Sequence, residues 1–457
     1  MLFLDYDDVP LLSILLGMPC VGAFFVSFIN TSRAANIKKC ALWVQGAVLL
    51  LLAIIGHQFD PGLTGCQMAE KMRWVSRLGL HYDVAIDTVS LTLIVCAAGL
   101  SFVATLCSTA VATARYKMSI ILSLLLESGV MGCFCANNVL LLYLFLEVIF
   151  FAFPFFLNIS VRGSSTSIPT VMAALFSSLA LFLTLIRVSH MGTHSLDVAR
   201  YDPIVLPTRW ALYFLGACLL RLEVCLWGIR RYARQPHASS ILLISALGPV
   251  FLSQLLLLFR LRILFAFPFP WLSYIVLPML GTVMVSLLRL FQRLRQGEEA
   301  TLEFLPLVAR WTCALVFLAN QTSTAGMVSG IFLMVTYALG VACFFLVPKE
   351  QERVKTTAIE VVILALLGAP CSGGFWAHMA LLRQFLVQRQ VVGCCLSLFV
   401  LLSSLLMGCF YGRCLAKRIE PATFPTRLEA RLSRALFWCC WGLLILSTLC
   451  PFLLESS

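Results

Sequence analysis

Long apolar segments separated by short polar ones dominate the hydropathy pattern of this chain. A helix needs roughly 20 mostly apolar residues to cross the hydrocarbon core of a bilayer. The segments are apolar all round, whereas the strands of a membrane barrel would be shorter and alternating. We therefore predict an all-α polytopic membrane protein with about fourteen transmembrane helices. The predicted spans are 10–29, 40–56, 84–107, 117–136, 138–160, 167–188, 210–229, 239–259, 266–288, 304–323, 325–347, 357–382, 391–412 and 435–454.

The organisation along the chain predicts one transmembrane helical domain over residues 1–457, because the stretches between spans are short. Spans one to three cover 10–107, a core bundle covers 117–412, and the last span covers 435–454. Two spans have the Gly, Pro or charged residues typical of broken helices. These are the seventh span, around Arg221 and Glu223, and the twelfth, at residues 367–374. Their separation is consistent with an internal repeat.

Composition and charge agree with a membrane protein. Charged residues make up 12% of the 457 residues, and mean hydropathy is +0.96, whereas soluble domains carry about 25% charged residues. The net charge of +12 resides mainly in short loops, so no nucleic-acid partner is predicted. Loops after odd-numbered spans carry about twice as many Lys and Arg as the others, which by the positive-inside rule places both termini outside.

Two further features of the sequence bear on processing and on metal binding. The acidic N-terminal segment resembles neither a secretory signal nor a transit peptide, so we expect the first span to be retained. The 19 cysteines lack the spacing of a metal site, and we expect them to be buried thiols that pack as small apolar residues.

Glu147 is the first candidate functional residue, because it lies in the apolar run 139–157 with no neutralising neighbour in the sequence. Ionisable residues at that depth are costly and usually mark an ion or proton pathway. A protonated Glu147 that hydrogen-bonds within the bundle is the alternative. Arg221 is the predicted counter-ion, because a buried charge is tolerated when it is paired. Arginine stays charged in proteins, so Arg221 cannot relay a proton itself.

Other polar residues interrupt the predicted spans: Asp87, Glu127, Glu223, Gln254, Arg310, Tyr337, Glu360 and His378. Glu127 places a second carboxylate in the span next to Glu147, and His378 can exchange protons near neutral pH. Some of these residues have a structural alternative. Asp87 and Glu360 lie near span ends and could face the interface, Arg310 could snorkel, and Tyr337 could simply pack.

Several segments resemble motifs of the antiporter-like membrane subunits of proton-pumping NADH:ubiquinone oxidoreductase (respiratory complex I), in particular its chain 4. The matching segments are 78–91, 126–132 with Glu127, 143–147 with Glu147, 367–375 and 407–413. The resemblance covers nearly the whole chain. It implies an antiporter-like inverted-repeat bundle with helices seven and twelve broken and both termini outside.

The chain departs from the family pattern in its central helices. The family's seventh-span lysine, which pairs with the fifth-span glutamate, aligns with Cys218, and Arg221 lies less than one turn further on. The eighth-span lysine aligns near Pro249, which leaves Gln254 as the nearest polar group. The eleventh-span histidine aligns with Tyr337, and the twelfth-span glutamate aligns with His378.

The resemblance implies a core membrane-arm subunit that couples NADH oxidation and ubiquinone reduction to proton translocation across the mitochondrial inner membrane. Glu147 would be the switchable carboxylate, Glu127 would couple it to a neighbouring subunit, and His378 would exchange protons near the outer aqueous side. The full set of candidate proton-pathway residues is Glu127, Glu147, Arg221, Glu223, Gln254, Tyr337 and His378.

The resemblance also implies the partners and cofactors. The partners are the antiporter-like chains 2 and 5, accessory subunits and membrane lipids, with cardiolipin at the basic loops. No cofactor is expected on this chain, since FMN, iron–sulfur clusters and ubiquinone belong to other subunits. Two alternatives are a structural bridging subunit with lost or altered pumping and an independent cation/proton antiporter subunit.

Overall fold

A computed structural model describes residues 10–63, 65–75, 80–160, 172, 175–183, 221, 324–346 and 373–387. These residues belong to two compact units. The first unit holds the described residues up to 183 together with Arg221, and the second holds the described residues from 324 onward.

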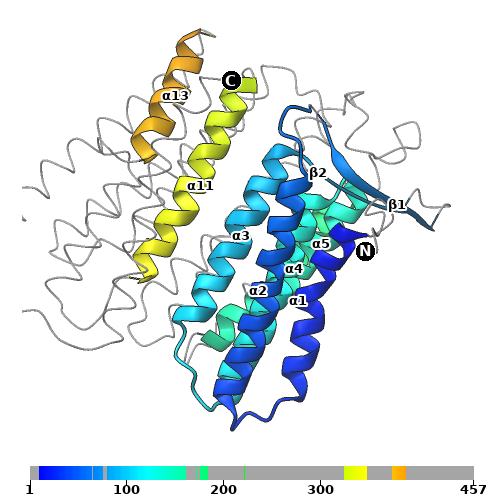
Figure 1. Cartoon of the computed structure of the whole chain (residues 1–457), viewed down its shortest axis with the longest axis vertical. Coiled ribbons are helices and arrows are strands. Elements are labelled where there is room, and N and C mark those ends of the chain that lie inside the picture. Colours follow the sequence, from blue (N-terminus) through cyan, green and yellow to red (C-terminus); the bar gives the residue numbers. More distant parts are fainter. Residues whose placement is uncertain are drawn as a thin grey trace, which may run out of the picture. The chain divides into compact units, whose positions relative to one another are not determined.

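Five long apolar helices lie in the described part of the first unit (Figure 1). They are α1 (Leu11–Phe28), α2 (Ala34–Gln58), α3 (Thr88–Cys107), α4 (Ala114–Cys135) and α5 (Val139–Ser160). Each is long and apolar enough to cross a membrane. Residues 175–183, within the sixth predicted span, are also helical. The prediction of a helical multi-pass membrane protein is therefore confirmed for this part of the chain, and the remaining predicted spans lie wholly or partly outside the described residues.

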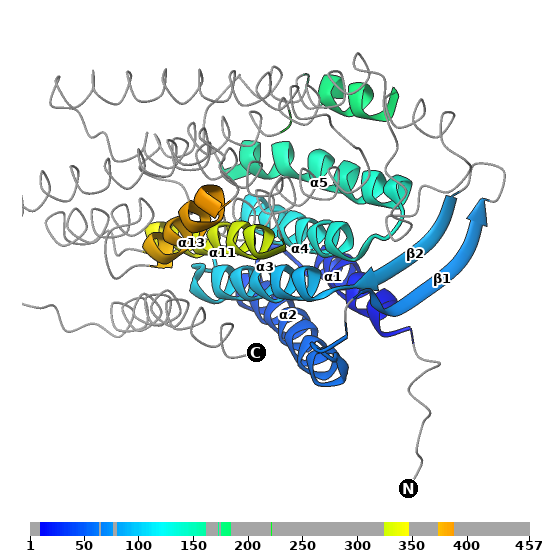
Figure 2. The ribbon, with the colours of Figure 1, turned by 90° about the horizontal axis from the view of Figure 1, so that it is seen from above.

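Helix α4 lies at the centre of the first unit and packs against α1, α2, α3 and α5 (Figure 2). Two glycines of the family-like segment 126–132 allow α5 to approach closely. A Cβ atom at Gly132 would lie 2.2 Å from the ring of Phe145, and one at Gly129 would lie 3.0 Å from the side chain of Ile149. Small residues let helix backbones approach one another in membranes, where packing is the main driving force.

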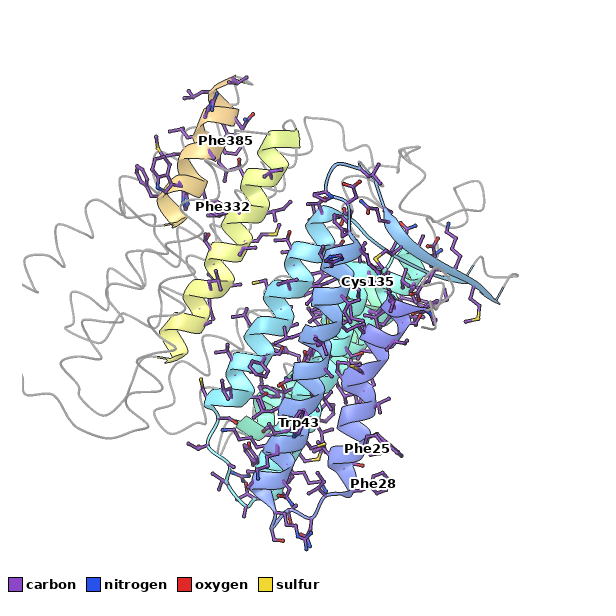
Figure 3. The ribbon with its side chains drawn as sticks, viewed as in Figure 1. Phe25, Phe28, Trp43, Cys135, Phe332 and Phe385 are labelled. Atoms are coloured by element: carbon purple, nitrogen blue, oxygen red, sulfur yellow. The ribbon has the colours of Figure 1, made fainter. Side chains whose placement is uncertain are left out.

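The outer faces of α1 and α2 carry large apolar side chains (Figure 3). Phe25, Phe28 and Trp43 are 58%, 72% and 80% exposed. Contiguous exposure of this kind is unusual for a soluble protein but costs nothing against lipid tails, which are as apolar as the side chains. The prediction that the cysteines are buried holds only in part among the described residues. Cys133 and Cys135 are buried in α4 as expected, whereas Cys20 and Cys66 are exposed.

A β-hairpin between α2 and α3 departs from the prediction of an all-α chain. Strands β1 (Gln67–Val75) and β2 (Leu80–Ile86) pair antiparallel. The predicted span 84–107 is therefore wrong at its start, because residues 84–86 belong to β2 and α3 begins at Thr88. Asp87 lies outside the helix as its N-cap, where its carboxylate accepts a 2.7 Å hydrogen bond from the Ser90 amide. Capping by a short acidic side chain satisfies an amide that the first helical turn leaves unpaired.

The hairpin is fastened to the helices at its end of the first unit. The Glu70 carboxylate accepts hydrogen bonds from the amides of Leu12 (2.7 Å) and Ser13 (3.0 Å), so it caps the start of α1 from a distant strand. The positive end of a helix dipole favours a carboxylate at this position. The buried Asp83 accepts at its carbonyl oxygen from the Asn137 amide (2.9 Å), which joins the hairpin to the connection between α4 and α5.

Tyr82 of β2 adds a third contact between the hairpin and α1. Its hydroxyl lies 2.7 Å from the hydroxyl of Ser13. Partial burial raises the pKa of Tyr82 above the ordinary tyrosine value, and this outweighs the opposite effect of the Ser13 hydrogen bond. Burial therefore favours the neutral phenol in the folded chain.

At the opposite helix ends, lysines donate to carbonyl oxygens that the last helical turns leave unpaired. The Lys38 ammonium donates to the carbonyls of Leu106 (2.9 Å) and Ser108 (2.6 Å) at the end of α3. The Lys117 ammonium donates to the carbonyl of Ser27 (2.7 Å) at the end of α1. Cations at helix C-termini are favoured by the helix dipole, so these basic residues, predicted to lie on the inner side, also fasten neighbouring helices.

The described part of the second unit consists of α11 (Thr324–Leu346) and α13 (Gly373–Val387), which pack against each other. Helix α11 matches the predicted span 325–347. Helix α13 continues five residues past the predicted end at 382. Residues 367–372 of the predicted break lie outside the described residues, and α13 begins at the next residue, Gly373.

Candidate functional site

Helix α5 presents Tyr143 and Glu147 on one face, because residues four apart lie one above the other on a helix. Both side chains are half-buried. The position of this face depends on the packing of α5 against α4, where Phe145 and Ile149 lie over the two glycines described above. Tertiary packing therefore sets where the Glu147 carboxylate lies.

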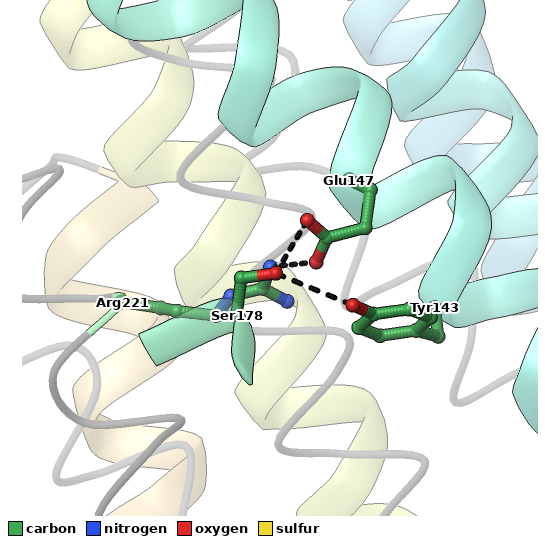
Figure 4. A network of polar contacts seen from close by, with 4 residues as sticks. All are labelled: Tyr143, Glu147, Ser178 and Arg221. Carbon is green, nitrogen blue, oxygen red and sulfur yellow. Dashed lines mark hydrogen bonds and ion pairs between the residues drawn. The ribbon is translucent and has the colours of Figure 1, made fainter. Parts of the chain in front are cut away.

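Glu147 forms an ion pair with Arg221 (Figure 4). Arg221 Nη2 lies 2.5 Å from Glu147 Oε1. The arginine side chain is fully buried, whereas the glutamate side chain is 32% exposed. The guanidinium also lies over the ring of Phe150, 4.1 Å from its centroid, an arrangement in which the negative face of the ring stabilises a cation. The structure thus brings together the two residues that the sequence suggested as partners.

The second carboxylate oxygen of Glu147 has a different partner. Ser178, in the helical segment 175–183, donates its hydroxyl to Glu147 Oε2 at 2.5 Å. The Tyr143 hydroxyl lies 3.3 Å from the same Ser178 oxygen, and its ring stacks on Phe182 with centroids 5.4 Å apart. Figure 4 shows the resulting chain of polar contacts from Tyr143 through Ser178 to Glu147.

Within the described part of the chain, the Arg221 guanidinium is incompletely hydrogen-bonded. Its Nε and Nη1 atoms are buried and have no hydrogen-bond partner among the described residues. A buried guanidinium needs a counter-charge, because the desolvation of a charge costs several kcal/mol. Within the described part of the chain that counter-charge is Glu147, so the charge state of this carboxylate determines how well Arg221 is stabilised.

Glu127 forms a second buried polar pair in the same unit. The Gln45 side chain of α2 donates to Glu127 Oε2 at 2.9 Å, and each residue is only 1% exposed. Gln45 Oε1 and Glu127 Oε1 have no partner within the described residues. Sequence reasoning missed Gln45, although a glutamine in the middle of an apolar span is itself a signal. It also missed Ser178, which the sequence does not distinguish from other serines in apolar spans.

Two further predicted residues belong to the second unit. His378 of α13 is buried, and its Nδ1 lies 2.6 Å from the Gly374 carbonyl oxygen. Because a carbonyl oxygen can only accept, Nδ1 carries the proton and Nε2 is the acceptor atom of the neutral ring. Tyr337 of α11 is also buried. The other predicted positions lie outside the described residues: Glu223, Gln254, Arg310 and Glu360.

Sequence comparison relates the chain to subunits of quinone oxidoreductases. No family model matches it. Subunit M of NADH-quinone oxidoreductase from Rickettsia felis is 24% identical over 80% of each chain. The corresponding subunit M from Rickettsia typhi is 27% identical over 42% of this chain, and the match spans 40% of that relative's length. Chain 4 of the NAD(P)H-quinone oxidoreductase of Prochlorococcus marinus (strain MIT 9313) is 30% identical over 30% of this chain and 25% of its own.

Solved structures show the same fold at lower sequence identity. A chain of respiratory complex I from Thermus thermophilus matches with a TM-score of 0.70 over 96% of both chains, at 14% identity. A chain of the Mrp complex from Dietzia matches with a TM-score of 0.66 over 87% of this chain and 78% of its own, at 17% identity.

The chain shares the fold of a class of multi-pass membrane proteins that includes chains of respiratory complex I and of the Mrp complex. Within that class, the relatives are subunit M and chain 4 of NADH-quinone and NAD(P)H-quinone oxidoreductases. The comparisons therefore confirm the predicted resemblance to an antiporter-like subunit of complex I.

Proposed function

We propose that this chain is a membrane-arm subunit of an NADH:quinone oxidoreductase and that it translocates protons when the complex reduces ubiquinone. The observation that carries the proposal is the ion pair between Glu147 and the fully buried Arg221. Ionisable residues buried at membrane depth are expensive and typically serve ion or proton transfer. A purely structural pair could be replaced by apolar side chains at no loss of stability.

Glu147 is the group that changes protonation in this proposal. Arg221 remains charged, because a guanidinium does not lose its proton in a protein. When Glu147 binds a proton, the attraction between the two side chains weakens and Arg221 loses its counter-charge. Proton uptake at Glu147 is thereby linked to the position of the arginine and of its helix. Glu127 and Gln45 would form a second proton site in the same unit, and His378 would exchange protons in the second unit.

The remaining expectations from the resemblance belong to the same proposal. The chain would reside in the mitochondrial inner membrane with both termini toward the intermembrane space. Its partners would be the neighbouring antiporter-like chains 2 and 5, accessory subunits and lipids such as cardiolipin at the basic loops. This chain would bind no cofactor, and FMN, iron–sulfur clusters and ubiquinone would be held by other subunits. The relatives support such a complex by what they are called, subunits of quinone oxidoreductases.

Replacement of Glu147 by Gln tests the proposal. The complex that contains this chain would be reconstituted into vesicles, and the number of protons translocated per electron from NADH to quinone would be measured. Glu147→Gln keeps the size of the side chain but cannot bind and release a proton, so the ratio should fall. Gln58→Glu, a change at an exposed position at the end of α2, serves as a control for altered charge. An unchanged ratio in Glu147→Gln would remove the pumping role and leave a structural bridging subunit.

An independent cation/proton antiporter is the second candidate. The observation that favours it is the shared fold with a chain of the Mrp complex. Purification of the chain from its native membrane separates the candidates, because a complex I subunit would copurify with NADH-oxidising activity. An antiporter would instead drive cation exchange in vesicles under an imposed pH gradient, without NADH.

A further inference from the structure

The two oxygens of the Glu147 carboxylate serve different neighbours. Oε1 is held by the Arg221 guanidinium, and Oε2 accepts the hydrogen bond from Ser178. Ser178 is 8% exposed, and Arg221 is completely buried. A proton can bind Glu147 at either of these oxygens, and the Glu147 side chain itself is 32% exposed. The Arg221 side offers no donor that can release a proton, since the guanidinium stays charged.

The hydrogen-bonding capacity of Ser178 fixes the direction of the hydrogen bonds that lead to Glu147 Oε2. A serine hydroxyl has one donor hydrogen and two acceptor lone pairs. Ser178 uses its hydrogen toward the Glu147 carboxylate, which can only accept when it is ionised. Toward Tyr143, 3.3 Å away, Ser178 can then only accept, so the tyrosine hydroxyl is the donor. The three groups form an ordered chain in which every hydrogen points toward Glu147.

We infer that Tyr143 and Ser178 form a proton relay that loads Glu147 at Oε2. The inference rests on the proposed function, because it assigns the route by which the translocated proton reaches its carboxylate. Neither hydroxyl was among the residues that the hydropathy pattern singled out as charged or titratable. Tyr143 lies one helical turn from Glu147. It forms the end of the chain of hydrogen bonds that is remote from the carboxylate, and its side chain is half-buried, as is that of Glu147.

The transfer balances without a net change in either hydroxyl group. A proton from water binds the Tyr143 oxygen while the tyrosine hydrogen moves to the Ser178 oxygen. The Ser178 hydrogen moves in turn to Glu147 Oε2, which becomes a neutral carboxylic acid. One O–H bond forms and one breaks at each hydroxyl, so tyrosine and serine are regenerated. The net result is one proton moved from water to Glu147, which discharges the carboxylate that holds Arg221.

Substitutions that remove one hydroxyl at a time test the relay in the reconstituted complex. Tyr143→Phe keeps the ring that stacks on Phe182 and removes only the hydroxyl. Ser178→Ala interrupts the chain, and Ser178→Thr restores a hydroxyl at the same position. We expect Tyr143→Phe and Ser178→Ala each to lower the rate of proton translocation about a hundredfold, the lower end of the range for the loss of a positioned proton-transfer group.

Two further readouts separate a relay from a merely structural role. The double variant Tyr143→Phe/Ser178→Ala should be no slower than either single variant, because both interrupt one chain. The rate ratio between H2O and D2O should also change in the single variants and return toward the original value in Ser178→Thr. Tyr116 and Ser108, whose hydroxyls are 3.2 Å apart away from Glu147, provide the matched control pair. Tyr116→Phe should leave the rate and the isotope ratio unchanged.

The outcomes distinguish the relay from the proposed function. Loss of translocation in Glu147→Gln together with unchanged rates and isotope ratios in Tyr143→Phe and Ser178→Ala would overturn the relay and leave the pumping role intact. Unchanged translocation in Glu147→Gln would overturn the pumping role itself. Additive losses in the double variant would also overturn the relay, because independent structural defects add whereas steps of one chain do not. If Ser178→Ala fails to assemble, Tyr143→Phe and Ser178→Thr carry the test.

Discussion

Substitution of Gly132 by Ala tests how α4 positions the helix that carries Glu147. A Cβ atom at this position would lie 2.2, 2.4 and 2.5 Å from the Cδ1, Cε1 and Cγ atoms of Phe145. Favourable carbon–carbon contacts lie at about 3.5–4.0 Å, so the ring must retreat by more than about 1 Å. Rotation of the ring about its own axis does not move Cγ. Either the Phe145 side chain changes rotamer or α5 moves away from α4.

The expected cost combines two opposing effects. Insertion of a methyl group into a packed interface typically costs about 1–3 kcal/mol. Alanine is better than glycine inside a helix by about 1 kcal/mol. Because the contact at Gly132 involves the stem of the ring as well as its edge, we expect the steric effect to exceed the propensity gain. The net loss should be about 1–2 kcal/mol in the free energy of unfolding.

Gly46 of α2 provides a matched control, because a Cβ atom there would have no neighbour within 4 Å. Gly46→Ala should therefore be neutral or stabilising by up to about 1 kcal/mol. The measurement is unfolding of the full chain in mixed detergent micelles, with proton translocation by the assembled complex as a second readout. Phe145→Ala should suppress the effect of Gly132→Ala in the double variant, because it removes the ring that the new methyl group contacts.

Equal stability of Gly132→Ala and Gly46→Ala would refute this reasoning, since the two differ in the proximity of Phe145 and share the change in helix propensity. A loss in Gly132→Ala that Phe145→Ala does not suppress would show that the methyl group acts through another neighbour. Either result would show that the contact between Gly132 and Phe145 does not fix the position of α5, and of Glu147 on it, against α4.

Two further predictions concern charges at fixed positions. Glu147→Gln should destabilise the folded chain by about 3–5 kcal/mol, because it leaves the buried Arg221 without a counter-charge. Arg221→Met should cost less, because the 32% exposed glutamate can bind a proton and become neutral. A double variant more stable than Glu147→Gln alone would support this, and equal losses in both single variants would contradict it. Glu70→Ala should lower the free energy of unfolding by about 0.5–2 kcal/mol, since it removes the cap of α1. Amide hydrogen exchange should accelerate at the first amides of α1 and not in α3, which carries its own cap. Acceleration of equal size in both helices would refute a local cap.

The polar contacts at the two ends of the first unit are complementary. At one end, Glu70 and Asp87 accept from amides at the starts of α1 and α3. At the other end, Lys38 and Lys117 donate to carbonyls at the ends of α3 and α1. Each charge meets the helix end of opposite polarity. The outer charges thus complete the helix ends, while the charges in the middle of the described helices of the first unit belong to Glu127 and to the Glu147–Arg221 pair.

Much of the fold of the first unit follows from the sequence alone, for a local physical reason. Each helix that crosses a bilayer must satisfy its own backbone polar groups and present apolar side chains to lipid. Both requirements are written into about 20 consecutive residues. The starts and ends of α1, α4 and α5 therefore lie within a few residues of the predicted spans. The same local reasoning identifies Glu147 and Glu127 as unusual, because a carboxylate contrasts with its apolar neighbours.

The short polar segments are less predictable. The connection between α2 and α3 forms a hairpin with irregular register, and its pattern is too short and mixed to separate strand from loop. Asp87 could be read from the sequence as an intramembrane carboxylate or as an interfacial one. Its role as an N-cap depends on where the hairpin ends and the helix begins, because a cap is defined by local backbone geometry.

The partners of the buried carboxylates are decided by the tertiary structure. Gln45 lies 82 residues from Glu127, and Arg221 lies 74 residues from Glu147. Charge alone made Arg221 a candidate, because a buried carboxylate calls for a cation. Nothing comparable distinguished Gln45 or Ser178, whose uncharged side chains become important only through the helix face that packs beside them. Hydropathy acts within one segment and can be read along the chain, whereas a hydrogen bond between helices depends on their relative rotation and depth.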